Sequence, residues 1–135
     1  MIAIHICGTN SEVIKGLEQL AQVGLIKFAN DGQLIEAVKQ DGGLKISRDV
    51  NKIIIGYSRL AQFFRGISYL IQGVDVVDEQ PAFANNGYML DCSRNAVASV
   101  SAVKWLIRYM GLSNNVGYWS CCATGYEPRP TGYVF

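Results

Sequence analysis

The chain has 135 residues, enough for one domain or slightly more, and 50% of them are hydrophobic. With 17% charged residues, this composition excludes a disordered or low-complexity chain. The 12 basic and 11 acidic side chains leave a net charge of +1, which gives no electrostatic reason to expect nucleic acid or an anionic membrane as a partner. No apolar run reaches the roughly 18 residues that a membrane span needs.

The first eight residues have no basic region and no small-residue cleavage site, so we predict no signal peptide and a cytoplasmic location. The chain has four cysteines, two of them adjacent: Cys7, Cys92, Cys121 and Cys122. There is no Cys-x-x-Cys pair, and His5 is the only histidine. We therefore predict reduced thiols, no metal site and no cofactor, with His5 as an ordinary strand residue.

The first half of the chain alternates strand and helix patterns. Residues 2–7 are apolar and β-branched, which predicts a strand. Thr9-Asn10-Ser11-Glu12 has the spacing of a capping box, and the apolar residues after it predict a helix over about 10–22. Gly24 is a suitable end for that helix.

Three strands are predicted next, at 34–39, 44–48 and 52–56, the last apolar enough to be central. Asp41-Gly42-Gly43 is interpreted as a hairpin turn between the first two. Ser58 is a candidate cap for a helix over 59–72. Its apolar stripe has helical spacing and includes a Phe pair predicted to be core: Leu60, Phe63, Phe64, Ile67, Leu70 and Ile71.

Residues 74–86 are rich in polar residues and are interpreted as a connection, with a domain boundary there. A strand at 87–91, a helix that starts at Ser99 and covers 100–110, and a strand at about 116–120 then form a β-α-β unit. The predicted fold is an α+β domain with the order β-α-β-β-β-α, followed by that unit. Because the unit cannot bury its helix alone, we expect Val103, Ile107 and Met110 to be exposed and the chain to self-associate.

The segment Gly87-Tyr88-Met89-Leu90-Asp91-Cys92-Ser93-Arg94 is the strongest candidate for chemistry. This pattern predicts a strand that ends at Asp91 and is followed by a small polar pair and then Arg94. In a (β/α)8 barrel, such strand ends and the loops after them build the active site. A guanidinium suits two neighbouring acceptors such as adjacent sugar hydroxyls. The alternative is that Asp91 and Arg94 pair with each other or with neighbouring barrel residues.

This segment resembles the first barrel strand of glycoside hydrolase family 20, the β-N-acetylhexosaminidases, whose motif is Gly-x-x-Leu-Asp-x-Ser-Arg. The helix at 102–110 is similar to the one that follows in that family, and residues 54–67 resemble the end of its small N-terminal domain. The resemblance implies a small α+β domain at 1–80 and, at 87–135, the beginning of a truncated catalytic (β/α)8 (TIM) barrel.

The resemblance also implies a retaining glycosidase that acts on terminal N-acetylhexosamine, with the substrate's own acetamido oxygen as nucleophile. Arg94 would bind sugar hydroxyls, supported by Asp91. The family's catalytic Asp–Glu pair, which comes late in its barrel, has no counterpart here, because Asp78-Glu79 precedes the barrel motif. We therefore predict that the chain alone is inactive and holds no catalytic residue.

Two other interpretations remain open at this point. The chain could be a stand-alone, non-catalytic α+β module that binds a protein or a carbohydrate, in which case Arg94 would not matter. It could also be a gene product that has lost its function. Tyr118, Trp119 and Tyr126 are further candidates for stacking on sugar rings, although idle aromatic side chains are the plainer interpretation.

Overall fold

The computed structural model of the chain describes residues 1–7, 11–82, 87–91, 97–113 and 117–121. These residues form strands and helices in the order β1 (Ile2–Cys7), α1 (Ser11–Gln22), β2 (Ile26–Phe28), β3 (Gln33–Lys39), β4 (Leu44–Arg48), β5 (Ile53–Tyr57), α2 (Leu60–Ile71), β6 (Val77–Glu79), β7 (Gly87–Asp91), α3 (Val100–Leu112) and β8 (Gly117–Cys121). The fold is α+β, as the sequence predicts. The capping residues Thr9 and Asn10 lie outside the described residues.

Six strands form one mixed sheet in the order β2-β1-β3-β5-β4-β6. The strand β1 pairs in parallel with both β2 and β3, and β3 pairs in parallel with β5. The strand β4 runs antiparallel to its neighbours β5 and β6. The predicted central position of the strand at 52–56 is confirmed, because β5 lies between two other strands.

The predicted hairpin between residues 34–39 and 44–48 is wrong. The strand β5 lies between β3 and β4, so those two strands are not neighbours, and Gly42 (φ 96°) turns a wider connection. The hairpin forms one turn later, between β4 and β5, where the amide of Asp49 donates to the carbonyl of Lys52 at 2.8 Å. A glycine turn marks a reversal of direction but does not say which strand becomes the partner.

The order β-α-β-β-β-α predicted for the first domain is incomplete by two strands, β2 and β6. Each has only three residues, too few to show an alternating pattern. The strand β6 also corrects the prediction that residues 74–86 are a connection, because it pairs with β4 at the edge of the sheet. Its acidic sequence is compatible with an edge position, where one side stays open to water.

Gly32 lies where the chain crosses β1 on its way from β2 to β3. Ile4 pairs with Phe28 on one side and with Gln33 on the other, so the intervening residues pass across its backbone. A Cβ at Gly32 would lie 2.7 Å from the Ile4 nitrogen. The close approach of two backbones therefore requires glycine at this position.

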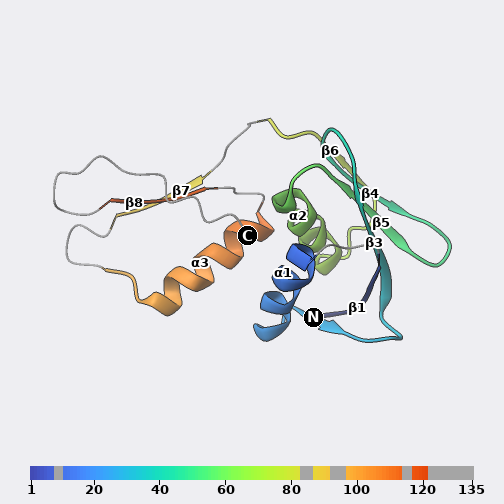
Figure 1. Cartoon of the computed structure of the whole chain (residues 1–135), viewed down its shortest axis with the longest axis horizontal. Helices are drawn as coiled ribbons and strands as arrows, with labels where there is room; N and C mark the ends of the chain where they lie inside the picture. Colours follow the sequence, from blue (N-terminus) through green and yellow to red (C-terminus); the bar gives the residue numbers. More distant parts are fainter. Residues whose placement is uncertain (8–10, 83–86, 92–96, 114–116, 122–135) are drawn as a thin grey trace.

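The helices α1 and α2 cover one face of the sheet (Figure 1). The core between them and the sheet includes Val13 and Leu17 from α1, Ile55 from β5 and the predicted pair Phe63 and Phe64, all buried. The start of α2 differs from the prediction that Ser58 caps it. The cap is Arg59, and the side chain of Gln62 accepts hydrogen bonds from the amides of Ser58 (2.8 Å) and Arg59 (3.1 Å).

The helix α3 lies beside α2, on the side of α1 and α2 away from the sheet (Figure 1). Ser99 caps it as predicted, with its hydroxyl accepting from the amide of Ala102 at 3.2 Å. The expectation that Met110 is exposed is wrong, since it is 5% exposed, and Val103 and Ile107 are half-buried. The described helices include none that is long and apolar enough to cross a bilayer.

Candidate functional site

The carboxyl-terminal edge of the β7–β8 pair is where the sequence places its candidate site. These two strands are parallel and in register from Gly87 opposite Gly117 to Asp91 opposite Cys121. Asp91 is the last residue of β7, so it stands at the edge where both strands end. The helix α3 connects the strands, as a parallel pair requires.

The candidate residues at this edge are only partly described. Asp91 has its backbone in β7, and its side chain lies outside what the structure describes; Arg94 lies outside the described residues altogether. Tyr118 and Trp119 belong to β8, again without described side chains, and Tyr126 is outside the described residues. The role of Arg94 with Asp91 as a sugar-binding pair, and their pairing with each other, therefore stay predictions.

A polar cluster links α2 to β6. A terminal nitrogen of Arg65 donates to the Tyr69 hydroxyl at 2.8 Å, and that hydroxyl donates to Glu79 at 2.7 Å. The Arg65 guanidinium also lies over the Tyr69 ring, 4.4 Å from its centre. The hydrogen bond to Glu79, followed by burial, raises the pKa of Tyr69. The cluster fixes the edge strand to the helix layer.

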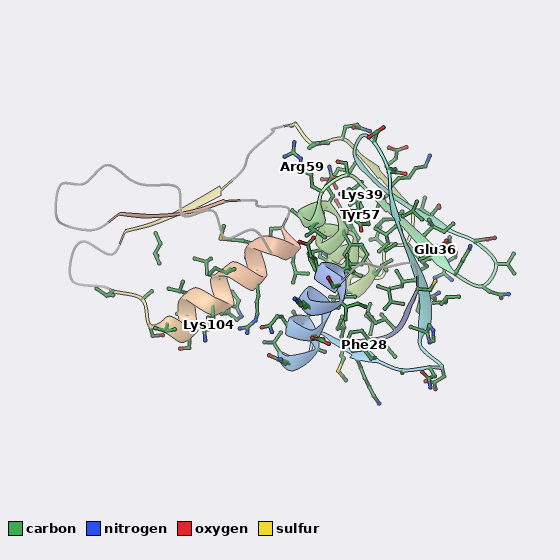
Figure 2. The ribbon with its side chains drawn as sticks, in the orientation of Figure 1. Phe28, Glu36, Lys39, Tyr57, Arg59 and Lys104 are labelled. Atoms are coloured by element: carbon green, nitrogen blue, oxygen red, sulfur yellow. The ribbon has the colours of Figure 1, made fainter. Side chains whose placement is uncertain are left out.

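A second charged group lies on the face of the sheet away from the helices. Lys52 donates to Glu36 at 2.6 Å, and this hydrogen bond raises the pKa of Lys52. Figure 2 shows Glu36 on the sheet, far from Lys104 on α3. The exposed Cys7 is a free thiol on β1, where the exposed His5 is an ordinary strand residue. Within the described ranges, no three His, Cys, Asp or Glu side chains gather as metal ligands.

A hollow of about 480 Å³ lies between α2 and α3, and the sequence prediction did not identify it. Trp105, Arg108 and Tyr109 line it from α3, while Arg65 of α2 and Gln72, which caps the end of α2, line it from the other side. The spacing of the α3 residues was visible as one stripe of the helix. Periodicity alone could not identify the hollow, because it cannot tell which partner a stripe will face.

Comparison with known proteins gives one kind of match. No family model matches the chain, and no curated protein matches it. Among solved structures, the chain is similar to a GH20 exo-β-N-acetylglucosaminidase from Vibrio harveyi in complex with N-acetylglucosamine, with a TM-score of 0.60 and 21% sequence identity. The match covers 87% of this chain and 21% of that protein, so the chain spans about a fifth of its length. The two share a fold over this region.

Proposed function

We propose that this chain is part of a β-N-acetylhexosaminidase-like glycosidase of glycoside hydrolase family 20. In this proposal, residues 1–80 are the small α+β domain and residues 87–135 are the beginning of the catalytic (β/α)8 barrel. The supporting observation is the fold match to an exo-β-N-acetylglucosaminidase over 87% of the chain. It coincides with a sequence motif, Gly87 to Arg94, that begins on a strand followed by a helix and a parallel strand.

The proposed parent enzyme cleaves a terminal N-acetylhexosamine with retention of configuration. The acetamido oxygen of the sugar attacks the anomeric carbon while an acidic residue protonates the leaving oxygen; water then opens the oxazolinium intermediate. The proposed ligand is thus a carbohydrate, bound without a cofactor. Because the acid–base pair is missing from this chain's sequence after residue 87, we predict no hydrolysis by these 135 residues alone.

Arg94 is the proposed substrate-binding residue. A guanidinium offers a rigid fork of donors that fits two adjacent sugar hydroxyls. Asp91, at the end of β7, would hold that fork in place by accepting from it. Both residues would then act in binding and orientation of the terminal sugar, and neither would transfer a proton.

A chimera tests this proposal directly. Residues 1–113 of this chain would replace the segment of the Vibrio harveyi enzyme that aligns with them, and hydrolysis of a chromogenic N-acetyl-β-glucosaminide would be measured. We expect activity, and we expect Arg94→Ala to lower kcat/KM by about 10–100-fold, the value of a charge-assisted hydrogen bond. Arg48→Ala is the matched control, because Arg48 lies on β4 in an exposed ion pair with Asp75.

Two results would contradict the proposal. A chimera that unfolds cooperatively on heating yet has no activity would reject the enzyme origin. An active chimera in which Arg94→Ala matches Arg48→Ala would reject the role of Arg94. The alternative, a stand-alone non-catalytic binding module, also predicts that substitution of Arg94 has no effect on function.

A further inference from the structure

The hollow between α2 and α3 has two distinct walls. On α3, the residues Trp105, Arg108 and Tyr109 are spaced at i, i+3 and i+4 and form one stripe toward it. Arg65 of α2 and Gln72, the residue that caps the end of α2, line the opposite side. Its volume of about 480 Å³ is within the range of small-molecule sites, which are mostly apolar with a few polar groups.

The aromatic wall is exposed to solvent. The rings of Trp105 and Tyr109 are stacked, with centres 5.4 Å apart and planes 9° from parallel. Trp105 is 62% exposed and Tyr109 is 55% exposed, whereas Met110 of the same helix is 5% exposed. The helix thus buries the face that carries Met110 and leaves the aromatic pair on another face uncovered. Large exposed aromatic side chains beside a hollow are typical of binding sites.

The charge of the site is positive. A terminal nitrogen of Arg108 donates to the side-chain oxygen of Gln19 at 3.0 Å, which fixes the guanidinium without neutralising it. The charge of Arg65 is compensated by Glu79, because its Nε lies 3.8 Å from a Glu79 carboxylate oxygen, and its terminal nitrogen donates to the Tyr69 hydroxyl. The described lining residues include no Asp or Glu. Among the described residues, Arg108 has no carboxylate partner, and this uncompensated guanidinium favours an anion.

We propose that this slot binds a small anionic ring compound, with the ring against the Trp105–Tyr109 pair and the carboxylate at Arg108. The C–H face of a pyranose and the π face of an aromatic ring can both pack against an aromatic side chain. The ligand is therefore a uronic acid or an aromatic carboxylic acid. The proposal does not depend on the glycosidase origin, since it uses none of residues 87–96.

Tryptophan fluorescence can report on this slot alone. The chain has two tryptophans, Trp105 and Trp119, so Trp119→Phe leaves Trp105 as the sole reporter. This variant would be titrated with glucuronate and with benzoate, and with their neutral counterparts glucose and benzyl alcohol, each up to roughly 10 mM. We expect a saturable change with at least one of the two acids. A response to glucuronate identifies an acidic sugar, and a response to benzoate identifies an aromatic acid.

Matched charge variants of α3 test the geometry. Arg108→Gln removes one charge inside the slot and should weaken binding about tenfold or more, as expected for a lost charge-assisted hydrogen bond. Arg108→Lys keeps the charge without the planar fork and should give an intermediate loss. Lys104→Gln removes one charge from the exposed Lys104 of α3 (Figure 2), which does not line the slot, and should change affinity less than about twofold. Circular dichroism would verify that each variant is folded.

Several outcomes would overturn the proposal. No saturable change with either acid would do so, and so would equal affinity for the neutral compounds. Equal effects of Arg108→Gln and Lys104→Gln in folded proteins would remove the assigned role of Arg108. A dimer in sedimentation that itself changes Trp105 fluorescence would show that a second copy of the chain fills the slot.

Discussion

The sheet with α1 and α2 buries its apolar side chains much more completely than the β7–α3–β8 unit does. Every buried hydrophobic side chain among the described residues lies between Ile4 and Leu70, with the single addition of Met110. In α3, by contrast, Val100 is 73% exposed and Trp105 is 62% exposed. The first region buries its own apolar stripes, while the second presents much of its apolar surface to solvent.

The contrast follows from topology. An amphipathic helix is stabilised mainly by what its apolar face packs against, and α1 and α2 each have the sheet. The helix α3 instead meets α2 along one side, and β7 and β8 form only a two-stranded sheet. A two-stranded pair gains little stability by itself. The stability of the described fold should therefore depend on the first region, and the second should tolerate substitution.

Truncation of one aromatic residue in each region gives the largest test of this contrast. Phe63 is fully buried and meets Tyr57 and Phe64 edge to face, with ring centres 5.3 and 5.4 Å away. Phe63→Ala should lower the free energy of unfolding by about 3–5 kcal/mol. Trp105→Ala removes a larger but exposed ring and should cost about 0.5 kcal/mol or less. Chemical denaturation measures both, and comparable losses would refute the contrast.

Two glycine substitutions test whether the pairing of the edge strand β6 with β4 contributes to the stability of the first region. A Cβ at Gly43 would overlap the carbonyl oxygen of Glu79, so Gly43→Ala must displace β6 from β4. We expect a loss of about 1–3 kcal/mol, as for other overpacked sites. Gly56→Ala is the control, because the three atoms nearest to its Cβ would all belong to the side chain of Gln40, which can move. Equal thermal stabilities of the two variants would show that β6 contributes little.

The sequence was sufficient to predict elements whose own residues carry the signal. The stripe from Leu60 to Ile71 is one face of α2, and the cap at Ser99 starts α3, because periodicity and capping are local. Strand pairing is not local. Nothing in Asp41-Gly42-Gly43 shows that β5 will lie between the strands on either side of this turn.

The candidate sites divide in a similar way. The position of Asp91 at a strand end followed from its motif, and the strand is present. The slot between α2 and α3 required knowing which helices face each other, and the sequence does not contain that information in any short pattern. From the sequence alone, Arg108 is expected to be an exposed charge on a helix. The structure shows that its guanidinium donates a hydrogen bond to Gln19, which lies 89 residues earlier in the chain.

The smallest expected effect concerns alkaline pH and the polar cluster that joins the two layers of the first region. The pKa of Tyr69 is raised, mainly by the hydrogen bond to Glu79, and the pKa of Tyr57 is raised by burial. A raised pKa means that the folded state holds protons that the unfolded chain has already lost. Their stabilising contribution is complete below about pH 10, the value of an unfolded tyrosine, and is lost as pH rises through the folded pKa.

The contribution of Tyr69 is measured by how steeply the free energy of unfolding falls with pH, and not by its value at any one pH. Tyr69→Phe also removes two hydrogen bonds at neutral pH, so its stability is lower throughout. Its decline above pH 10 should nevertheless be shallower than that of the original chain, because one group with a raised pKa is gone. Glu79→Gln removes the main cause of the shift and should also flatten the decline. Urea denaturation between pH 8 and about 11 measures the slopes, and parallel curves for all three proteins would mean that the Tyr69–Glu79 bond does not couple β6 to α2 in solution.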